Sequence, residues 1–277
     1  KIMKKIVIFE YPIIGTDKAL KKLSNKNLNA LVCVGQIKTP KIRMNLYKKA
    51  IKAGFKLPVI LSPHSYVSPH TKIGEGTIIM NGAIINAGSV IGKNCIINSK
   101  ALIEHDVIVG DHCHVSTAAV LNGGVILGNG SFVGSGAIIK EGVKIGNNCI
   151  VVNSVALGGH VTIGDFAIIG GLSAIHQFVS IGKHAMISGG SLVRKDVPPF
   201  VKAAREPLSF VGINSIGLRR RGFSNDKIQE IQNIFRILYQ SNNNNTQAVF
   251  KIETEITVSA ERDEIVSFIQ NSGRGIM

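Results

Sequence analysis

The chain is poor in aromatic and acidic residues and has no long apolar run. Aromatic side chains make up 5% of its 277 residues, and tryptophan is absent. No apolar stretch approaches the roughly 18 residues of a membrane-spanning helix, so we expect no membrane span and a cytoplasmic protein. A core with so few aromatic rings must be built mainly from aliphatic side chains.

The shortage of acidic residues leaves the chain strongly basic. It has 17 Asp and Glu residues against 32 Lys and Arg residues, a formal net charge of +15. This excess favours a polyanionic partner, which is a phosphate-bearing cofactor, an acidic carrier protein or a nucleic acid. Because aromatic residues are not interleaved with the basic ones and no nucleic-acid-binding module is recognisable, we expect no nucleic-acid partner.

The strongest feature of the chain is a repeat of six residues. From Leu61 to Val193 an aliphatic residue occupies every sixth position without interruption. A period of six fits neither an α-helix nor an alternating strand. It fits a β-solenoid, in which each hexad forms one short strand and a corner, and three hexads close a triangular coil of about 18 residues.

Each hexad also has a small or β-branched residue four positions after the aliphatic residue, and glycine often follows the aliphatic residue directly. We expect the aliphatic residue to fill the prism, the small residue to fit the inner corner, and glycine to tolerate the backbone angles of the corner. Cys95, Cys113 and Cys149 occupy the small position, where a thiol acts as a small hydrophobic group. We therefore expect neither disulfides nor a metal site.

The repeat divides the chain into residues 1–60, residues 61–198 and residues 199–277. The first part is expected to be a small α/β unit, with strands at 6–9 and 30–34 and helices at 17–23 and 40–53. The middle part is the solenoid. The last part is expected to form helices that cap its open edge, the first of them with Ser224 as N-cap. The predicted fold is mainly β, a parallel β-helix with an α/β unit before it and α-helices after it.

A histidine at one corner of the solenoid is the first candidate for chemistry. His105 is the third residue of its hexad, and the same corner one coil later carries Gly123. Adjacent strands lie about 4.8 Å apart, so a backbone amide near Gly123 would lie close to the imidazole. A neutral imidazole beside an amide donor suits acyl transfer, because the base removes a proton and the amide holds an oxyanion. The alternative is a solvated corner histidine without a catalytic role.

Several segments of the first half resemble the hexapeptide acetyltransferases that modify sialic acids and UDP-amino-sugars. The segments are Tyr11-Pro12-Ile13-Ile14-Gly15, Ala30 to Gly35, Lys41-Ile42-Arg43, Ile97-Asn98-Ser99, Ile103-Glu104-His105-Asp106 and His112 to Ser116. The resemblance implies a left-handed β-helix, a homotrimer, acetyl-CoA as donor, and sites between neighbouring subunits.

The same resemblance implies roles for individual residues. His105 would be the general base, Asp106 the carboxylate that orients it, and Gly123 the oxyanion donor. His114 would contact acetyl-CoA, and Asn98 and Gly124 would line the cofactor site. The first sixty residues depart from this family, because the glycine-rich turn that usually follows the first strand is missing. Without those glycines and a helix N-terminus, binding of a nucleotide sugar by this unit is in doubt.

The second half resembles a different family, the UDP-N-acetylglucosamine acyltransferases of lipid A synthesis. The segments are Leu157-Gly158-Gly159-His160, Asp165 to Gly171, His176-Gln177-Phe178, Asp196 to Pro199 and Gly217 to Phe223. The resemblance implies that His160, His176 and Gln177 belong to an active-site groove. It also implies that Arg219, Arg220 and Arg221 contact phosphates or an acyl carrier protein. The place of that family's catalytic histidine is occupied by Glu141.

Strand spacing separates the two candidate sites. His105 and His160 lie three coils apart, about 15 Å along the axis, and a general base must come within about 3 Å of its proton. The upper histidines therefore cannot assist His105, and the plainer interpretation of His160 and His176 is that of corner residues without a role. We expect a hybrid of the two families joined near 145–152, of natural or engineered origin.

Three functions remain open from the sequence. The first is an acetyl-CoA-dependent acetyltransferase acting on an amino sugar, a nucleotide sugar or a sialic acid. The second is a UDP-N-acetylglucosamine acyltransferase that uses acyl carrier protein but lacks its base. The third is a solenoid scaffold without catalytic activity. The sequence identifies neither the acceptor sugar nor the choice between O- and N-acetylation.

Overall fold

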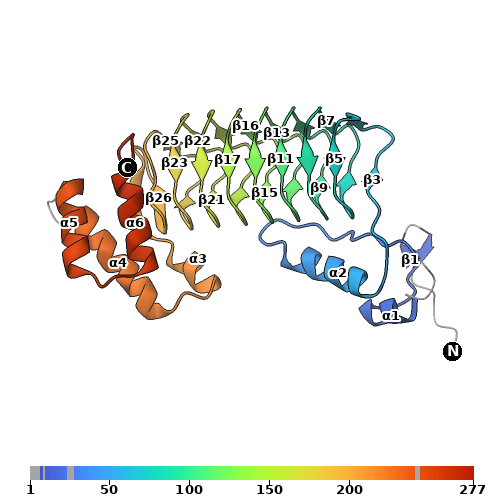
Figure 1. Cartoon of the computed structure of the whole chain (residues 1–277), viewed down its shortest axis with the longest axis horizontal. Coiled ribbons are helices and arrows are strands. Elements are labelled where there is room, and N and C mark those ends of the chain that lie inside the picture. Colours follow the sequence, from blue (N-terminus) through green and yellow to red (C-terminus); the bar gives the residue numbers. More distant parts are fainter. Residues whose placement is uncertain (1–6, 9, 24–27, 241–243) are drawn as a thin grey trace.

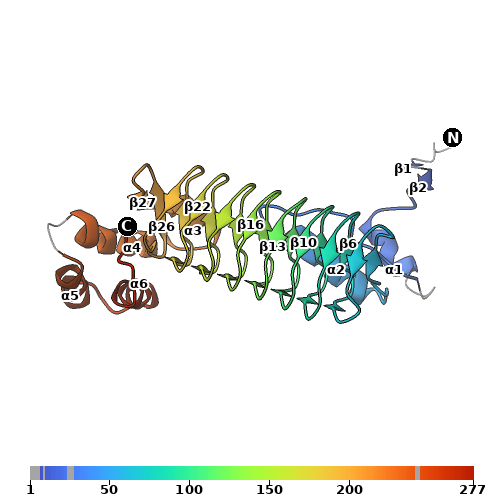
Figure 2. The same cartoon turned by 90° about the horizontal axis from the view of Figure 1, so that it is seen from above.

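A computed structural model describes residues 7–8, 10–23, 28–240 and 244–277. It shows a long triangular prism with a small unit at the N-terminal end and helices at the C-terminal end (Figures 1 and 2). The prism is a left-handed parallel β-solenoid, as predicted. Among the described residues, no helix combines the length and the apolar composition needed to cross a membrane.

Three sheets form the faces of the prism, and their strands are parallel and two residues long except at the C-terminal end, where the longer β26 and β27 pair antiparallel. The β4–β25 sheet contains β4 (Tyr66–Val67), β7 (Ile84–Ile85), β10 (Leu102–Ile103), β13 (Val120–Leu121), β16 (Ile138–Ile139), β19 (Ala156–Leu157), β22 (Ala174–Ile175) and β25 (Leu192–Val193). The β5–β23 sheet contains β5 (Lys72–Ile73), β8 (Val90–Ile91), β11 (Ile108–Val109), β14 (Ile126–Leu127), β17 (Lys144–Ile145), β20 (Thr162–Ile163) and β23 (Ser180–Ile181). The β3–β27 sheet contains β3 (Ile60–Leu61), β6 (Ile78–Ile79), β9 (Ile96–Ile97), β12 (His114–Val115), β15 (Phe132–Val133), β18 (Ile150–Val151), β21 (Ile168–Ile169), β24 (Met186–Ile187), β26 (Val201–Ala204) and β27 (Ser209–Ile213).

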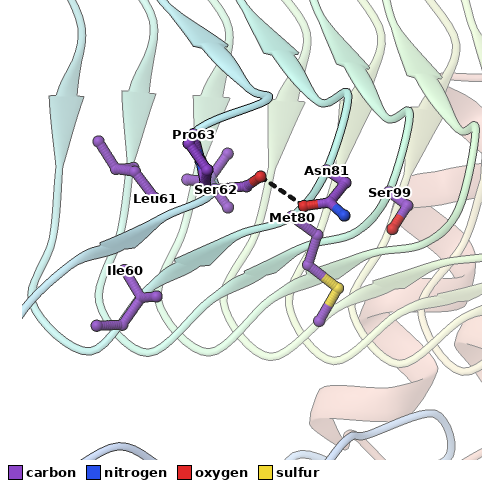
Figure 3. Close-up of a pocket in the computed structure, with 8 residues that line it drawn as sticks. Ile60, Leu61, Ser62, Pro63, Met80, Asn81 and Ser99 are labelled. Atoms are coloured by element: carbon purple, nitrogen blue, oxygen red, sulfur yellow. Dashed lines mark hydrogen bonds between the residues drawn. The ribbon is translucent and has the colours of Figure 1, made fainter.

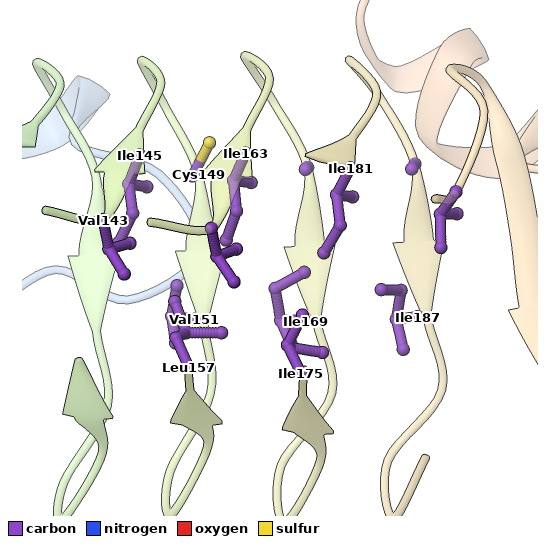
Figure 4. Packing of buried hydrophobic residues seen from close by; sticks show 14 of the residues in the cluster. Val143, Ile145, Cys149, Val151, Leu157, Ile163, Ile169, Ile175, Ile181 and Ile187 are labelled. Atoms are coloured by element: carbon purple, nitrogen blue, oxygen red, sulfur yellow. The ribbon is translucent and has the colours of Figure 1, made fainter. Parts of the chain in front are cut away.

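The register confirms the predicted coil length. Ile103 of β10 pairs with Leu121 of β13, eighteen residues later, and the same step recurs along all three faces. The second residue of each strand points inward, and Ile103 and Leu121 are completely buried. Figure 4 shows the equivalent side chains of later coils, among them Ile145, Ile163 and Ile181, meeting inside the prism. The small position is also buried, as Val107 and Ala119 show.

The corners depend on a left-handed backbone conformation at one fixed position. The residue three places after each inward aliphatic residue has a positive φ at every corner from Gly76 to Gly190. Asp106 and His160 adopt this conformation although they are not glycine, with φ of 59°. The glycines directly after the aliphatic residues were expected to serve this purpose, and that expectation was wrong. They allow close approach of coils instead, since a Cβ atom on Gly128 would lie 2.5 Å from the backbone of Gly146.

The three corner columns of the prism differ in how their main-chain amides are used. Where the β5–β23 and β3–β27 sheets meet, one main-chain amide in each of four successive coils donates to an Asp or Asn side chain one coil above. The acceptors are Asp111, Asn129, Asn147 and Asp165, at 2.7 to 2.9 Å. We call this column the Asx edge. Where the β4–β25 and β5–β23 sheets meet, the corner residues include His105, Gly123, Glu141, His160 and His176, and we call that column the histidine edge.

The N-terminal unit has less regular structure than predicted. It contains β1 (Val7–Ile8) paired with β2 (Tyr11–Pro12), a 3-10 turn η1 (Asp17–Ala19), α1 (Leu20–Leu23) and α2 (Lys41–Lys52). Of the strand expected at 6–9, residues 6 and 9 lie outside the described residues. The strand expected at 30–34 is absent, because carbonyls that would pair with another strand accept hydrogen bonds from Arg43 instead.

Arg43 fastens this unit to the solenoid. Its side chain is only 1% exposed, and its Nε donates to the carbonyl of Asn94 at 3.0 Å. Its Nη1 donates to the carbonyls of both Val32 and Val34. Burial lowers the pKa of the guanidinium from its ordinary value. A single buried cation therefore joins α2, the preceding loop and the β3–β27 sheet.

The C-terminal part caps the solenoid as predicted. It contains α3 (Ser215–Arg220), α4 (Asn225–Gln240), α5 (Asn245–Glu255) and α6 (Ala260–Gln270). Ser224 accepts a hydrogen bond from the amide of Lys227 and so caps α4. The buried stripe of α4, including Ile231 and Phe235, joins the core of the prism. The sequence did not indicate α5, whose N-terminus is closed by a capping box of Asn244 and Gln247.

Candidate functional site

The histidine edge brings most of the predicted site residues into one column. Because β10, β13 and β16 pair in register, His105, Gly123 and Glu141 occupy the same corner in three successive coils. The strand spacing separates neighbouring levels by about 4.8 Å. Gln177 lies two coils above Glu141 in this column. The edge is therefore a line of exposed groups parallel to the solenoid axis.

His105 and Asp106 form a hydrogen-bonded pair at this edge. The Nδ1 atom of His105 lies 2.9 Å from Oδ2 of Asp106, and both side chains are exposed. An ionised carboxylate can only accept, so the contact places a proton on Nδ1 and leaves the Nε2 lone pair free. The positive φ of Asp106 turns its side chain back toward the preceding residue, which gives the short local pair. This is the arrangement of an oriented general base.

Gly123 lies directly beside the imidazole. A Cβ atom on Gly123 would lie 2.7 Å from both Nε2 and Cε1 of His105, so only glycine leaves room for the ring. Within the described part of the chain, the Gly123 amide has no hydrogen-bond acceptor. The Gly124 amide is different, since it donates to the carbonyl of His105 at 3.0 Å. Of these two amides, the one at Gly123 is available to an oxyanion.

His114 and Asn98 lie on a different face from His105. His114 begins β12 in the β3–β27 sheet, which is the face opposite the histidine edge. Its Nδ1 lies 2.7 Å from the carbonyl of Gln36, and its Nε2 lies 3.3 Å from Nδ2 of Asn98. Burial lowers the pKa of His114, and the hydrogen bond to Gln36 offsets part of this effect. Within one chain these residues do not meet His105.

The upper part of the histidine edge contains the other predicted histidines. The rings of His160 and Phe178 stack with centroids 5.2 Å apart. His176 lies about one coil above His160, and its Nδ1 is 3.2 Å from Nη2 of Arg274. No sequence pattern pointed to Arg274, because only the return of the C-terminal segment to the last coil brings it to this edge.

Arg219 and Arg220 do not join these histidines. Both are exposed on α3, which lies beside the Asx edge. The next residue, Arg221, fixes that position, since its Nη2 donates to the carbonyl of Phe166 at 3.0 Å and its guanidinium lies over the Phe166 ring. His184 stacks on the other side of Phe166. Within a single chain, the width of the β5–β23 face therefore separates these arginines from His160 and His176.

Glu141 occupies the place where the lipid A enzymes would have their base. Its carboxylate is exposed, and a hydrogen bond from its own backbone amide, together with the charge of Lys140, lowers its pKa. A carboxylate with a lowered pKa is a weak proton acceptor at neutral pH. Glu141 and His105 therefore present different groups at the same corner of their coils, a carboxylate and an imidazole.

A shallow pocket lies at the N-terminal end of the solenoid, away from the histidine edge. It lies where the β3–β27 and β4–β25 sheets meet, and Figure 3 shows Ser62 hydrogen-bonded to Asn81 across adjacent coils. None of the predicted site residues lines it. No group of three potential metal ligands occurs in the part of the chain that the structure describes.

Two family models match parts of the chain. Residues 196–277 match Udp N-acetylglucosamine O-acyltransferase, domain 2, and residues 70–104 match bacterial transferase hexapeptide (six repeats). A solved UDP-N-acetylglucosamine acyltransferase from Bacteroides fragilis is 35% identical, covering 78% of this chain and 99% of that chain with a TM-score of 0.63. The chain belongs to the hexapeptide-repeat acyltransferase family. The solved Campylobacter jejuni acyltransferase is 27% identical over 78% of this chain and 98% of its own, with a TM-score of 0.66.

Curated relatives of this family match over a shorter stretch. The UDP-N-acetylglucosamine O-acyltransferase of Myxococcus xanthus, which uses acyl-[acyl-carrier-protein] by its name, is 37% identical over 90 residues. That segment is 32% of this chain and 35% of the relative. The corresponding Halorhodospira halophila protein is 38% identical over 88 residues. The chain thus matches about a third of the length of these relatives, and the predicted hybrid origin stays a prediction.

Proposed function

We propose that this protein transfers an acetyl group from acetyl-CoA to a hydroxyl or amino group of a sugar or nucleotide sugar. One observation carries the proposal. His105, already hydrogen-bonded to Asp106, lies against Gly123, whose amide is unoccupied in the described structure. Base, orienting carboxylate and oxyanion donor therefore occur within two successive coils.

The proposed reaction uses these groups in order. Nε2 of His105 takes the proton of the acceptor as its oxygen or nitrogen attacks the thioester carbonyl. The resulting oxyanion accepts a hydrogen bond from the Gly123 amide. When the carbon–sulfur bond breaks, the imidazolium returns its proton to the CoA thiolate. Asp106 holds the ring and stabilises its positive charge meanwhile.

We further propose a homotrimer with sites between subunits. The outward residues of the β4–β25 sheet are all apolar, and several are exposed, including Tyr66, Ile84, Ile138 and Leu192. This face adjoins the histidine edge and is uncovered within the chain. An uncovered apolar face of this length favours association with another copy. Since His105 and His114 do not meet in one chain, any shared role would require a neighbouring subunit.

A second candidate is the acyl-carrier-protein-dependent UDP-N-acetylglucosamine acyltransferase activity of the relatives. The match of residues 196–277 and the solved Bacteroides fragilis enzyme favour it. Glu141 argues against it, because this carboxylate stands where that family would place its catalytic histidine. If neither donor is used, the protein is a scaffold.

The test compares two donors and two variants. Purified protein is incubated with acetyl-CoA, and separately with long-chain acyl carrier protein, over a panel of UDP-sugars and sialic acids. We expect acetyl transfer that His105→Ala lowers by about 10² to 10⁴-fold, the usual cost of losing a general base. His160→Ala, a matched change of an exposed histidine on the same edge, should change it little. The reverse pattern would overturn the assignment of the lower site.

A further inference from the structure

The C-terminal segment is fastened to the last coil of the solenoid. Asp196 is 3% exposed, and its carboxylate accepts hydrogen bonds from the amide of Ser180 at 2.8 Å and the hydroxyl of Ser272 at 2.7 Å. Its main chain pairs with the segment as well, since the amide of Met277 donates to its carbonyl at 3.1 Å. The C-terminus accordingly lies beside β25 and β26 (Figure 1). These anchors give residues 272–277 a fixed position.

This anchoring places an arginine on the histidine edge. Nη2 of Arg274 lies 3.2 Å from Nδ1 of His176. A guanidinium can only donate, so this contact uses the Nδ1 lone pair and puts the imidazole proton on Nε2. The carbonyl of Gln177, 3.1 Å from the same nitrogen, can bind it only in the other tautomer. Arg274 and His176 together thus present several N–H donors and one positive charge to solvent, a combination that suits a phosphate group.

Positive charge on this edge occurs above Gly123 and not below it. The corner residues one coil below are Glu104, His105 and Asp106, and two coils below are Asn86, Ala87 and Gly88, so no lysine or arginine occurs there. Above it are Lys140, Arg194, Lys195 and Arg274. Glu141 pairs with Lys140, and Glu206 pairs with Arg194. Within the described structure Arg274 has no acidic partner, so its charge is available to an anion.

The path between the base and Arg274 contains five glycines, and the His160 ring and the Glu141 carboxylate lie over two of them, Gly142 and Gly159. Gly123, Gly124, Gly142, Gly158 and Gly159 all lie on the histidine edge between His105 and His176. Gly123 and His176 are three coils apart, which is about 14 Å at the strand spacing. A thin chain can therefore run along this stretch beside the His160 ring and the Glu141 carboxylate.

We infer that Arg274 and His176 bind the phosphate of a 4′-phosphopantetheine arm whose thioester lies at Gly123. This inference rests on the proposed function. From the thioester carbon to the phosphorus, the arm has about fourteen bonds, and a chain extended like a polypeptide spans about 16 Å over that number. The arm thus reaches from Gly123 to His176 with little slack. Coenzyme A and acyl carrier protein share this arm, so either donor presents the same phosphate.

The experiment measures donor binding by calorimetry on the full chain. The probes are acetyl-4′-phosphopantetheine and acetylpantetheine, which differ by one phosphate. We expect the wild-type protein to bind the phosphorylated probe about tenfold or more tightly, as a charge-assisted hydrogen bond to an exposed arginine would give. Arg274→Gln should remove most of this preference and leave the affinity for acetylpantetheine unchanged. Arg236→Gln, a matched change of an exposed arginine on α4, should leave both affinities unchanged.

The possible outcomes separate this inference from the proposed function. Equal binding of the two probes by the wild-type protein overturns the phosphate site, as does a preference for the phosphorylated probe that Arg274→Gln keeps. Absence of acetyl transfer and of binding by either probe removes the proposed function, and the inference fails with it. Acetyl-CoA and acetylated holo-acyl carrier protein form two further arms. Loss of affinity with Arg274→Gln in only one of them identifies the donor that uses the site.

Discussion

Substituting Gly123 with alanine separates the catalytic geometry from the stability of the solenoid. The new Cβ would lie 2.7 Å from Nε2 and Cε1 of His105, well inside ordinary van der Waals contact. The backbone of Gly123 does not adopt a positive φ, so alanine causes no conformational strain there. The exposed imidazole must therefore move by several tenths of an ångström to an ångström, away from the Gly123 amide.

This displacement acts mainly on the rate of reaction. A misplacement of about 1 Å in a catalytic group costs about 10²-fold. We expect Gly123→Ala to lower kcat by about this factor, with little change in melting temperature and in the KM for acetyl-CoA. Steady-state kinetics and calorimetry measure the two effects separately.

Gly190→Ala provides the opposite control. Gly190 has a φ of 70°, and no atom lies within 4 Å of a Cβ placed on it. Alanine there should cost about 1 kcal/mol of folding free energy through backbone strain and leave the kinetics unchanged. A folded Gly123→Ala protein with full activity would refute the assignment of His105 as the base beside Gly123.

Three further predictions concern the N-terminal unit, the pH dependence and the assembly. Arg43→Met should leave buried carbonyls without donors and destabilise the N-terminal unit by about 1 to 3 kcal/mol. Limited proteolysis should then remove this unit while the solenoid stays intact. Resistance to the protease equal to that of the wild-type protein would contradict the role of Arg43. Burial and then the charge of Arg221 lower the pKa of His184 to about 4. In the unfolded chain this histidine becomes protonated near pH 6.5, whereas in the folded protein it stays neutral down to about pH 4. The free energy of unfolding is therefore highest above pH 6.5 and falls by at most about 3 kcal/mol between pH 6.5 and 4. Chemical denaturation across this pH range should show that the free energy of unfolding depends less steeply on pH in His184→Phe than in the wild-type protein. An unchanged dependence would contradict the lowered pKa of His184. Sedimentation should give a molecular mass of about three times the 29.6 kDa of the chain, and Ile138→Glu should lower this mass. A stable wild-type monomer would remove the basis for intersubunit sites.

The sequence alone determined the solenoid, because a fixed period of six forces every coil to repeat the same contacts. Its inward residues, from Leu61 to Val193, follow the predicted pattern. His105, Asp106 and Gly123 were also predictable, since residues eighteen apart in such a repeat must be neighbours. The same argument placed Glu141, His160 and His176 on one edge.

Tertiary structure decided what the repeat does not encode. The loop at residues 30–34 was expected to be a strand, but its carbonyls bind the buried Arg43 from a later helix. The resemblance gave His114 a cofactor contact, and only the tertiary structure shows that the chain crossing its face occupies its Nδ1 through the carbonyl of Gln36. Arg274 comes to the histidine edge because the buried Asp196 holds the C-terminal segment. Each of these contacts joins residues at irregular separations, and no local periodicity reports them.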